Sequence, residues 1–481
     1  MTVRRLWSKD VSVQEIITAV ETELAEPLYR GVSLGCTFQD LRLAYRGVGA
    51  AQPGLMEWLR ATIRLLIWPV RGADPRRSRP GAEDAEKGRV LFASISKRDY
   101  SIRVIPRIVT HLGESECHVL TKLPQMRGVL PKSVGVFPWR DAPNLKLRSW
   151  RSEYSRCAKG WNDRLRDLQS RFGLSSYAVL LIRQSLILAS QRFDRYQSLI
   201  DSLRPRAVLV DFDRNPRAAC LILAARKRGI PTFTLVHGAA HGPDFFMPIV
   251  ADRVLCWGEH QREIFIQNGT EPDRVEIVGF QRIDDHSNVD PAEVRSRIGV
   301  PPKAVVAMYA SNPIERAART RILRLFCEAV HRAPNITGVV RLHPDEAISD
   351  YSEIVASFPS VRFTANNEFT PAEALTIADI VVAHSSGFAG EAVARGRLGV
   401  VLDAVGVPLG PGEDLVAWAG APRAQNAMEL AEVLSRVLTD DEFRRDLEEG
   451  GRRYSRRMYA ATGDEACRNI ATAVERYALS V

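Results

Sequence analysis

Short runs of aliphatic and β-branched residues alternate with stretches of helical periodicity along most of the chain. Buried-strand runs are predicted at 89–96, 117–121, 206–211, 231–236, 304–309, 337–342, 361–364, 380–383 and 398–402. Helical stretches are predicted at 102–111, 149–203 with a break near Gly173, 216–228, 320–331, 348–358, 371–377, 388–395 and 463–478. This alternation predicts parallel sheets whose two faces are covered by helices.

The alternation starts again near residue 304, which predicts two consecutive domains. We expect an α/β protein with two Rossmann-like, doubly wound domains that face each other across a cleft. The boundaries are an N-terminal extension at 1–87, a first domain at 88–285, a second domain at 286–460 and a C-terminal helix at 461–481. A chain of 481 residues that is 45% hydrophobic is large enough for more than one core.

The N-terminal extension has a helical pattern over 13–28 and a strand-like pattern over 32–45. Apolar residues recur at helical spacing over 55–70, with tryptophans near both ends and two arginines within. This stretch is shorter than the roughly 20 apolar residues that span a bilayer. It can lie flat in a membrane interface or pack on a core, and both alternatives stay open. An Arg-rich linker follows over 72–88.

The formal net charge of +9 predicts affinity for phosphates, acidic glycans or anionic lipid. No basic stretch is interleaved with stacking aromatics, so nucleic acid is not an expected partner. The seven cysteines are scattered singly, with no metal-site or disulfide-scaffold spacing, and no signal peptide is recognisable at the N-terminus. We therefore expect a cytoplasmic protein, peripheral on the inner face of the cytoplasmic membrane if 55–70 lies in the interface.

Two motifs in the second domain follow apolar strands and carry candidate chemistry. Arg341-Leu-His343-Pro344 ends one strand, and His384-Ser385-Ser386-Gly387 leads from another into a helix. Ligands bind at the carboxyl ends of strands in such sheets, and a helix N-terminus offers N–H groups to an anion. With an imidazole from the neighbouring strand end, the serine loop predicts a phosphate clamp for a nucleotide-sugar.

Further candidates lie nearby, each with a simpler alternative. Glu391 could bond ribose hydroxyls, or could form a helical ion pair with Arg395. Ser311 and Asn312 follow the first strand of the second domain and could contact donor phosphate, or could be ordinary turn residues. We expect the arginines of the next helix, Arg316 and Arg319, to be solvated.

The first domain offers candidates for a general base. His237 follows one strand, and Asp211 and Asp213 follow another. Any of the three could take the proton of an acceptor hydroxyl. Asp-x-Asp is also a pattern that binds hard divalent cations, and a strand-end cap with Asn215 is the simpler alternative.

The motifs, in this order, resemble a known family. Val236-His237-Gly238 and the segments at 251–258, 268–269 and 275–279 resemble the central part of glycosyltransferases with the GT-B fold. His343-Pro344 and Ser385-Ser386 resemble the HP and SS motifs of bacterial sialyltransferases, Kdo transferases and related capsule enzymes. Glycerophosphotransferases of teichoic acid synthesis carry comparable motifs. The sialyltransferase-like groups carry an acidic Asp/Glu-Asp/Glu-Gly tripeptide in their N-terminal domain, and the predicted first domain at 88–285 contains no such tripeptide.

The resemblance implies a glycosyltransferase that moves a sugar from a nucleotide-activated donor to a surface polysaccharide or lipid-linked glycan. It implies leaving-group stabilisation by dipoles and side chains, with no essential metal and no cofactor, since the nucleotide-sugar is a substrate. Three alternatives stay open: a CDP-polyol glycerophosphotransferase, an isomerase similar to UDP-sugar 2-epimerases, and a non-catalytic GT-B scaffold at the membrane.

Overall fold

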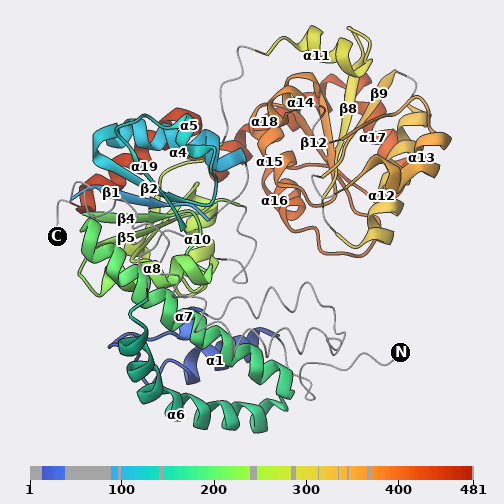
Figure 1. Ribbon diagram of the computed structural model, residues 1–481. Helices are drawn as coiled ribbons and strands as arrows, with labels where there is room; N and C mark the ends of the chain where they lie inside the picture. Colours follow the sequence, from blue (N-terminus) through green and yellow to red (C-terminus); the bar gives the residue numbers. More distant parts are fainter. Residues whose placement is uncertain are drawn as a thin grey trace. The chain divides into compact units, whose positions relative to one another are not determined.

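The computed structural model describes residues 13–37, 88–95, 99–139, 145–238, 246–282, 289–312, 314–333, 335–343, 346–365, 368 and 370–478. They form two compact units, each built on one parallel sheet (Figure 1). The first unit holds the described residues up to Cys256, with Ile264–Val278 and the described residues from Cys467 on. The second holds Trp257–Glu263 and the described residues of Gly279–Ala466. The predicted α/β class with two Rossmann-like domains is confirmed.

The sheet of the first unit has seven strands, all paired in parallel. Across the sheet they are β3 (Gly135–Pro138), β2 (Cys117–Thr121), β1 (Val90–Ala93), β4 (Ala207–Val210), β5 (Thr232–Leu235), β6 (Arg253–Cys256) and β7 (Val275–Ile277). Successive side chains of a strand enter two different cores: Leu91 and Ala93 belong to one, Val90 and Phe92 to the other. Burial on both faces explains why the strands of the sheet centre are continuously apolar.

Helices cover both faces of this sheet. The helices of this unit are α1 (Val13–Glu23), α4 (Asp99–Leu112), α5 (Met126–Val129), α6 (Leu147–Phe172), α7 (Ser176–Leu203), α8 (Pro216–Arg226), the part of α10 (Glu259–Gln267) from Ile264 on and the part of α19 (Gly463–Ala478) from Cys467 on, with short turns η1 (Gly35–Thr37), η3 (Glu114–Glu116) and η5 (Pro272–Arg274). One core joins the sheet to α4 and α19, and the other joins it to α6, α7 and α8. The C-terminal helix is therefore part of the first unit's core.

The two longest helices, α6 and α7, form a hairpin that also holds the N-terminal segment. The predicted break near Gly173 is confirmed: this glycine ends α6 with φ of 65°, a left-handed conformation that glycine adopts readily. Tyr29 is fully buried against Trp161 of α6, with ring centroids 6.3 Å apart, and Arg30 forms an ion pair of 2.6 Å with Asp194 of α7. Residues 13–37, predicted to belong to a separate extension, thus pack into the first unit.

One prediction in this segment is wrong for the residues described. A strand-like pattern over 32–45 was expected, but residues 32–37 form only an isolated bridge, Tyr29 with Val32, and the turn η1. Gly35 approaches α1 so closely that a Cβ there would lie 2.2 Å from the carbonyl oxygen of Glu21. Packing against α1 leaves no neighbouring strand for this stretch to pair with.

The sheet of the second unit has six parallel strands. Across the sheet they are β10 (Arg362–Thr364), β9 (Ile336–Arg341), β8 (Val305–Ala310), β11 (Ile380–Ala383), β12 (Leu398–Leu402) and β13 (Arg423–Ala424). The helices are α11 (Pro291–Ile298), α12 (Arg316–Arg332), α13 (Ser352–Ser357) with the turn η6 (Ile348–Tyr351), α14 (Pro371–Ile377), α15 (Gly387–Ala394), α16 (Pro411–Ala419), α17 (Ala427–Thr439) and α18 (Asp441–Met458). One apolar core of this unit joins α12 and α17 to the sheet.

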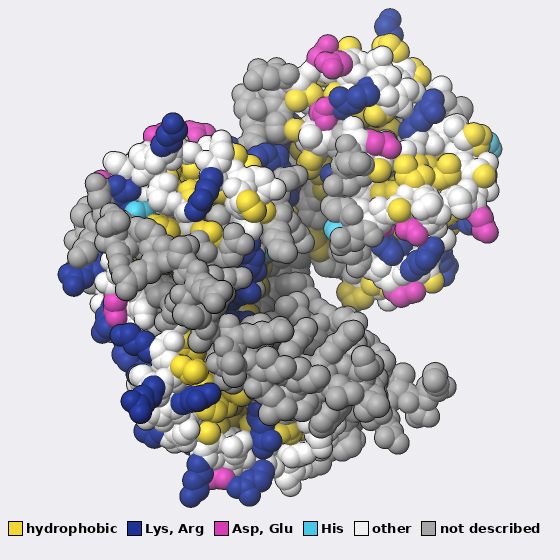
Figure 2. Space-filling model, in the orientation of Figure 1, with side chains coloured by type: hydrophobic (Ala, Val, Ile, Leu, Met, Phe, Trp, Pro, Cys, Tyr) yellow, Lys and Arg dark blue, Asp and Glu magenta, His cyan; other side chains and the backbone are white. Residues whose placement is uncertain are grey.

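Basic side chains are numerous on the surface of both units. Figure 2 shows Lys and Arg gathered over the region of α6 and α7, where acidic side chains are fewer, and the sequence of α6 itself contains more Lys and Arg than Asp and Glu. Within the described ranges, no helix is both long enough and apolar enough to cross a membrane. The predicted amphipathic helix at 55–70 and most of the linker lie outside the described residues.

Candidate functional site at the carboxyl edge of the second sheet

Three of the predicted loops lie along one edge of the second sheet. Ala310 at the end of β8 pairs with Arg341 at the end of β9, and Tyr309 pairs with Val382 near the end of β11. The loops that follow therefore leave the sheet at the same edge. The sequence prediction placed the histidine and serine motifs on neighbouring strands, and this detail is wrong. β8 lies between β9 and β11, so the Ser311-Asn312 loop separates the two motifs.

The His343 loop is held by a carboxylate that the sequence prediction did not include. Glu346 has a side chain only 1% exposed and accepts a hydrogen bond of 2.7 Å from the backbone N–H of His343. It also accepts the Tyr351 hydroxyl and lies 3.3 Å from Arg319. Burial, followed by Glu346, raises the pKa of Tyr351, so its hydroxyl stays a donor. Arg319 was expected to be solvated, and its pairing with a buried carboxylate corrects that prediction.

Ser385 and Ser386 lead from β11 into α15 as predicted. Ser386 is the residue before the helix, yet its side chain makes no capping hydrogen bond. Capping is the usual task of a serine at this position, so the structure does not support the simpler alternative for Ser386. In the first turn the N–H of Ala389 donates to the carbonyl oxygen of Ser386, whereas the N–H groups of Gly387 and Phe388 are too early in the helix to have an intrahelical acceptor. Hydroxyl and N–H groups suited to an anion thus lie together here.

A second helix begins beside this loop. A Cβ on Gly412, in the first turn of α16, would lie 2.4 Å from the carbonyl oxygen of His384, and one on Gly410 would lie 3.0 Å from Oγ of Ser385. The N-terminal ends of α15 and α16 are therefore close neighbours. Two helix N-termini at one place add their positive partial charges.

Oδ1 of Asn312 and Nε2 of His384 are buried at this edge and have no hydrogen-bond partner among the described residues. Asn312 is 7% exposed, and His384, which is fully buried, makes a 3.1 Å contact from Nδ1 to the carbonyl oxygen of Leu402. Buried polar groups are nearly always satisfied. Both atoms belong to loops after adjacent strands, where a bound polar ligand would satisfy them.

Glu391 lies on the second turn of α15 and is 8% exposed. Its partner is Arg282, at 3.4 Å, and not the Arg395 that helical spacing suggested. Arg341 lies close by, with its guanidinium 5.0 Å from the ring centroid of Phe388. Burial lowers the pKa of Arg341, and the charge of Glu391 opposes that shift. The site thus contains two arginines and a carboxylate beside the serine loop. Pro344 lies outside the described residues.

The candidate bases of the first unit follow β4. Asp211 accepts hydrogen bonds from the Ser94 hydroxyl at 2.8 Å and the Ile95 N–H at 2.9 Å. Asp213, fully buried, accepts from the N–H groups of Val250 and Ala251 at 2.6 and 3.1 Å. Burial raises the pKa of Asp213 in spite of these bonds. Both carboxylates hold neighbouring segments at the end of the sheet.

Arg214, the next residue along the chain, forms an ion pair with Glu21 of α1, and its side chain is fully buried. This contact joins the N-terminal segment to the carboxyl edge of the first sheet.

His237 follows β5 at the same edge and is half-buried. Its Nδ1 lies 2.8 Å from the carbonyl oxygen of Asp211, and its ring packs edge-on against Phe212 and Phe246 at 5.1 and 5.4 Å. Because a carbonyl can only accept, a neutral His237 carries its proton on Nδ1 and a lone pair on Nε2. This is the tautomer that a general base requires.

No group of three or more His, Cys, Asp or Glu within the described ranges is placed to hold a metal ion. Both oxygens of Asp211 and Oδ2 of Asp213 accept hydrogen bonds from N–H or hydroxyl donors. Independence from a metal stays a prediction.

Comparisons with known proteins bear on the fold. The chain matches no family model and no curated protein. Among solved structures it resembles a putative UDP-N-acetylglucosamine 2-epimerase from Listeria monocytogenes, with a TM-score of 0.54, 14% identity, and coverage of 82% of this chain and 98% of that one. It resembles a glycosyltransferase from Rickettsia africae, with a TM-score of 0.52, 10% identity, and coverage of 82% and 99%.

A UDP-GlcNAc 2-epimerase from Neisseria meningitidis, solved with UDP-GlcNAc bound, is similar at a TM-score of 0.50 and 13% identity, with coverage of 82% and 100%. At such identities the likeness concerns the fold. The chain has the two-domain fold of the GT-B type.

Proposed function

We propose that this protein is a glycosyltransferase that binds a nucleotide-sugar at the carboxyl edge of the second sheet and transfers the sugar to a surface polysaccharide or lipid-linked glycan. The observation that carries the proposal is the convergence of the Ser385-Ser386 loop, two helix N-termini and the His343 loop, with Asn312 Oδ1 and His384 Nε2 unsatisfied beside them. The serine hydroxyls and the N–H groups of the two helix N-termini are donors that suit the phosphates of a nucleotide. Asn312 Oδ1, and Nε2 of a neutral His384 whose Nδ1 faces a carbonyl oxygen, are acceptors that suit a hydroxyl or N–H group of the same ligand.

In the proposed reaction the oxygen of an acceptor hydroxyl forms a bond to the anomeric carbon, and the bond from that carbon to the donor phosphate oxygen breaks. The electron pair goes to the phosphate, where Ser385, Ser386, the first turn of α15 and His343 stabilise the charge. Preorganised donors of this kind account for much of the rate enhancement of many enzymes. Glu391, held by Arg282, would bind ribose hydroxyls.

The hydroxyl proton goes to Nε2 of His237 in this proposal. The tautomer described above suits that role, whereas Asp211 and Asp213 have oxygens that already accept hydrogen bonds from backbone N–H groups. We therefore assign the two aspartates a positioning role for the loops around His237. Attachment to the cytoplasmic face of a membrane stays a prediction, because residues 55–70 lie outside the described ranges.

A UDP-sugar 2-epimerase activity is the second candidate, since two of the similar structures named above carry that name. A CDP-polyol phosphotransferase would use the same phosphate-binding loops, and a scaffold would use none of them.

The test is a calorimetric and thermal-shift screen of the purified protein against CMP, CDP, UDP, GDP, ADP and TDP, starting with UDP. A nucleotide at 100 times its dissociation constant should stabilise the folded protein by about 2.7 kcal/mol. His343→Ala and the double variant Ser385→Ala/Ser386→Ala should lose this stabilisation. Matched controls on exposed helical positions of the same unit, His331→Ala and Ser435→Ala, should keep it.

Products then separate the activities. A transferase releases a nucleoside diphosphate from a UDP- or GDP-sugar, or a monophosphate from a CMP-sugar, only when an acceptor is present. An epimerase converts the donor without an acceptor, and a phosphotransferase releases CMP from a CDP-polyol. Binding of no nucleotide by the wild-type protein would contradict the proposal and favour the scaffold.

A further inference from the structure

A cavity of about 470 Å³ lies in the first unit, at the carboxyl ends of β2 and β3. It is separate from the residues assigned above. Its lining consists of Thr121, Lys122, Leu123, Pro124, Arg127, Val136, Pro138, Trp139 and Arg217. The volume falls within the roughly 300–1,000 Å³ of pockets that hold small molecules. The carboxyl edge of a doubly wound sheet is also where such domains bind ligands.

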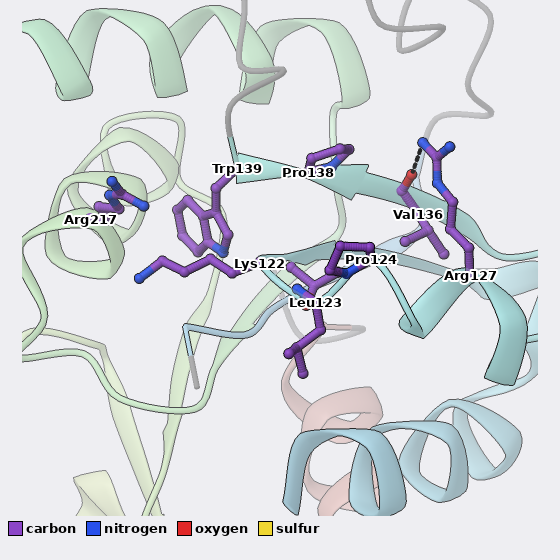
Figure 3. Close-up of a pocket in the computed structure, with 9 residues that line it drawn as sticks. Lys122, Leu123, Pro124, Arg127, Val136, Pro138, Trp139 and Arg217 are labelled. Atoms are coloured by element: carbon purple, nitrogen blue, oxygen red, sulfur yellow. Dashed lines mark hydrogen bonds between the residues drawn. The ribbon is translucent and has the colours of Figure 1, made fainter. Parts of the chain in front are cut away.

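The charged side chains of the lining are all positive: Lys122, Arg127 and Arg217, with no acidic residue among them. Figure 3 shows that Lys122 and Arg217 extend to the same side of the pocket, next to the ring of Trp139, whereas Arg127 lies on the other side and donates to the carbonyl oxygen of Val136. Arg217 is at the start of α8, so the positive end of that helix adds to the field. Two cations converging at one wall predict an anionic group between them.

The rest of the lining is apolar and includes one rigid aromatic ring. Nε1 of Trp139 donates a 2.7 Å hydrogen bond to the carbonyl oxygen of Ser94, and its ring packs edge-on against Tyr196 at 5.5 Å. These contacts fix the indole, which is 6% exposed, as one wall of the pocket. Leu123, Pro124 and Pro138 continue the apolar surface beside it. A ligand that fills the cavity must therefore have an apolar part next to its anionic part.

We propose that this cavity binds a phosphate ester of an apolar alcohol, with the phosphate between Lys122 and Arg217 and the apolar part on Trp139 and Leu123. The identification of this ligand as the acceptor, or as its lipid-phosphate carrier, rests on the proposed function. The proposal that the cavity binds such a ligand does not depend on that function. A nucleotide is disfavoured because Thr121 and Trp139 are the only uncharged polar side chains of the lining, and the Trp139 N–H already donates to Ser94. The basic side chains of the lining require the anionic part of the ligand, and its apolar side chains require the apolar part.

The test is calorimetry of the full-length protein with three probes: n-octyl phosphate, n-octanol and inorganic phosphate. Octyl phosphate should bind at least tenfold more tightly than either of the others, because only it uses both parts of the pocket. Lys122→Met and Arg217→Met keep most of the aliphatic stem and remove the charge. Each should weaken octyl phosphate binding about tenfold, the loss expected for one charged hydrogen bond. Lys132→Met, at an exposed position near β3 that does not line the cavity, is the matched control and should bind as the wild type does.

Equal binding of octyl phosphate and inorganic phosphate would overturn the amphipathic ligand. Equal binding by wild type and both charge variants would overturn the position of the phosphate. Sedimentation with phosphatidylcholine vesicles, with and without phosphatidic acid, separates a soluble ligand from a bilayer headgroup. If the protein binds vesicles through Lys122 and Arg217 but does not bind octyl phosphate, the two side chains contact a membrane surface and the pocket proposal is wrong. If a variant does not fold, Trp139→Phe, with folding checked by circular dichroism, should weaken octyl phosphate more than inorganic phosphate.

The two proposals can fail independently. UDP or another nucleotide should bind Lys122→Met and Arg217→Met as it binds the wild type, since its proposed site is in the second unit. Loss of nucleotide binding in His343→Ala with octyl phosphate binding intact would leave this cavity assignment standing.

Discussion

Replacing Glu346 by Gln tests whether a buried charge orders the His343 loop. The side chain of Glu346 is 1% exposed and holds three partners: the N–H of His343 at 2.7 Å, the Tyr351 hydroxyl, and Arg319 at 3.3 Å. Gln keeps the shape and one acceptor oxygen. It loses the charge, and its NH₂ group must face at least one donor that the carboxylate accepted.

The size of the effect follows from these contacts. Breaking a buried ion pair costs about 3–5 kcal/mol. Arg319 is 19% exposed and can recover part of its hydration, and Gln can still accept from His343. We therefore expect Glu346→Gln to lower the free energy of unfolding by about 2–4 kcal/mol, below the cost of a fully buried pair. Because His343 is then less well positioned, nucleotide affinity should also fall, by about tenfold for 1.4 kcal/mol of lost binding energy.

Urea unfolding at constant m-value measures the first effect, and calorimetry with the nucleotide found in the screen measures the second. Glu353→Gln, on the exposed side of α13 in the same unit, is the matched control and should change stability by no more than about 0.5 kcal/mol. If Glu346→Gln unfolds and binds nucleotide as Glu353→Gln does, the buried carboxylate does not position His343, and that part of the site must be abandoned.

Two further predictions concern the ends of the two sheets. Burial raises the pKa of Asp213 in the folded protein, so the folded state holds this proton more tightly and stability should fall as the pH rises from about 4 towards the raised pKa. Asp213→Asn cannot titrate and should show a flatter pH dependence of the melting temperature; identical slopes would refute the role of this carboxyl. Gly412→Ala would place a Cβ 2.4 Å from the His384 carbonyl oxygen, so it should cost about 1–3 kcal/mol of stability and weaken nucleotide binding. An Ala variant with unchanged unfolding and affinity would show that the two helix ends need not be this close.

The central strands could be predicted from the sequence because burial on both faces makes them continuously apolar, as in β4 and β11. The predictions missed β3, β6 and β7 of the first sheet and β13 of the second. The three strands of the first sheet have the short sequences GVFP, RVLC and VEI, which contain glycine, proline or charged residues. β3 is the strand at one edge of that sheet, and β6 and β7 are the last two strands at the opposite edge. Only pairing with an existing strand makes such segments β-structure.

The motif residues of the candidate site were visible in the sequence, whereas their support was not. His343 and Ser385 stand at strand ends, where the change from apolar to polar residues marks them. Glu346 lies only three residues after His343, and an acidic residue at that spacing could have suggested a side chain that accepts from the His343 N–H. Arg282 could not have been found, because the loop that brings it to Glu391 is far away in the sequence. The position of β8 between the two motif strands likewise depends on the crossover connections.

The membership of α19 in the first unit has a consequence for how the protein is made. Ile470 and Val474 of this helix are fully buried in the core that also contains Val90, Phe92 and Leu235. During synthesis the ribosome produces the whole second unit before this helix. The part of this sheet face that α4 does not cover therefore stays exposed until residues 467–478 emerge, and we expect a chain ending before them to be captured by chaperones or to aggregate.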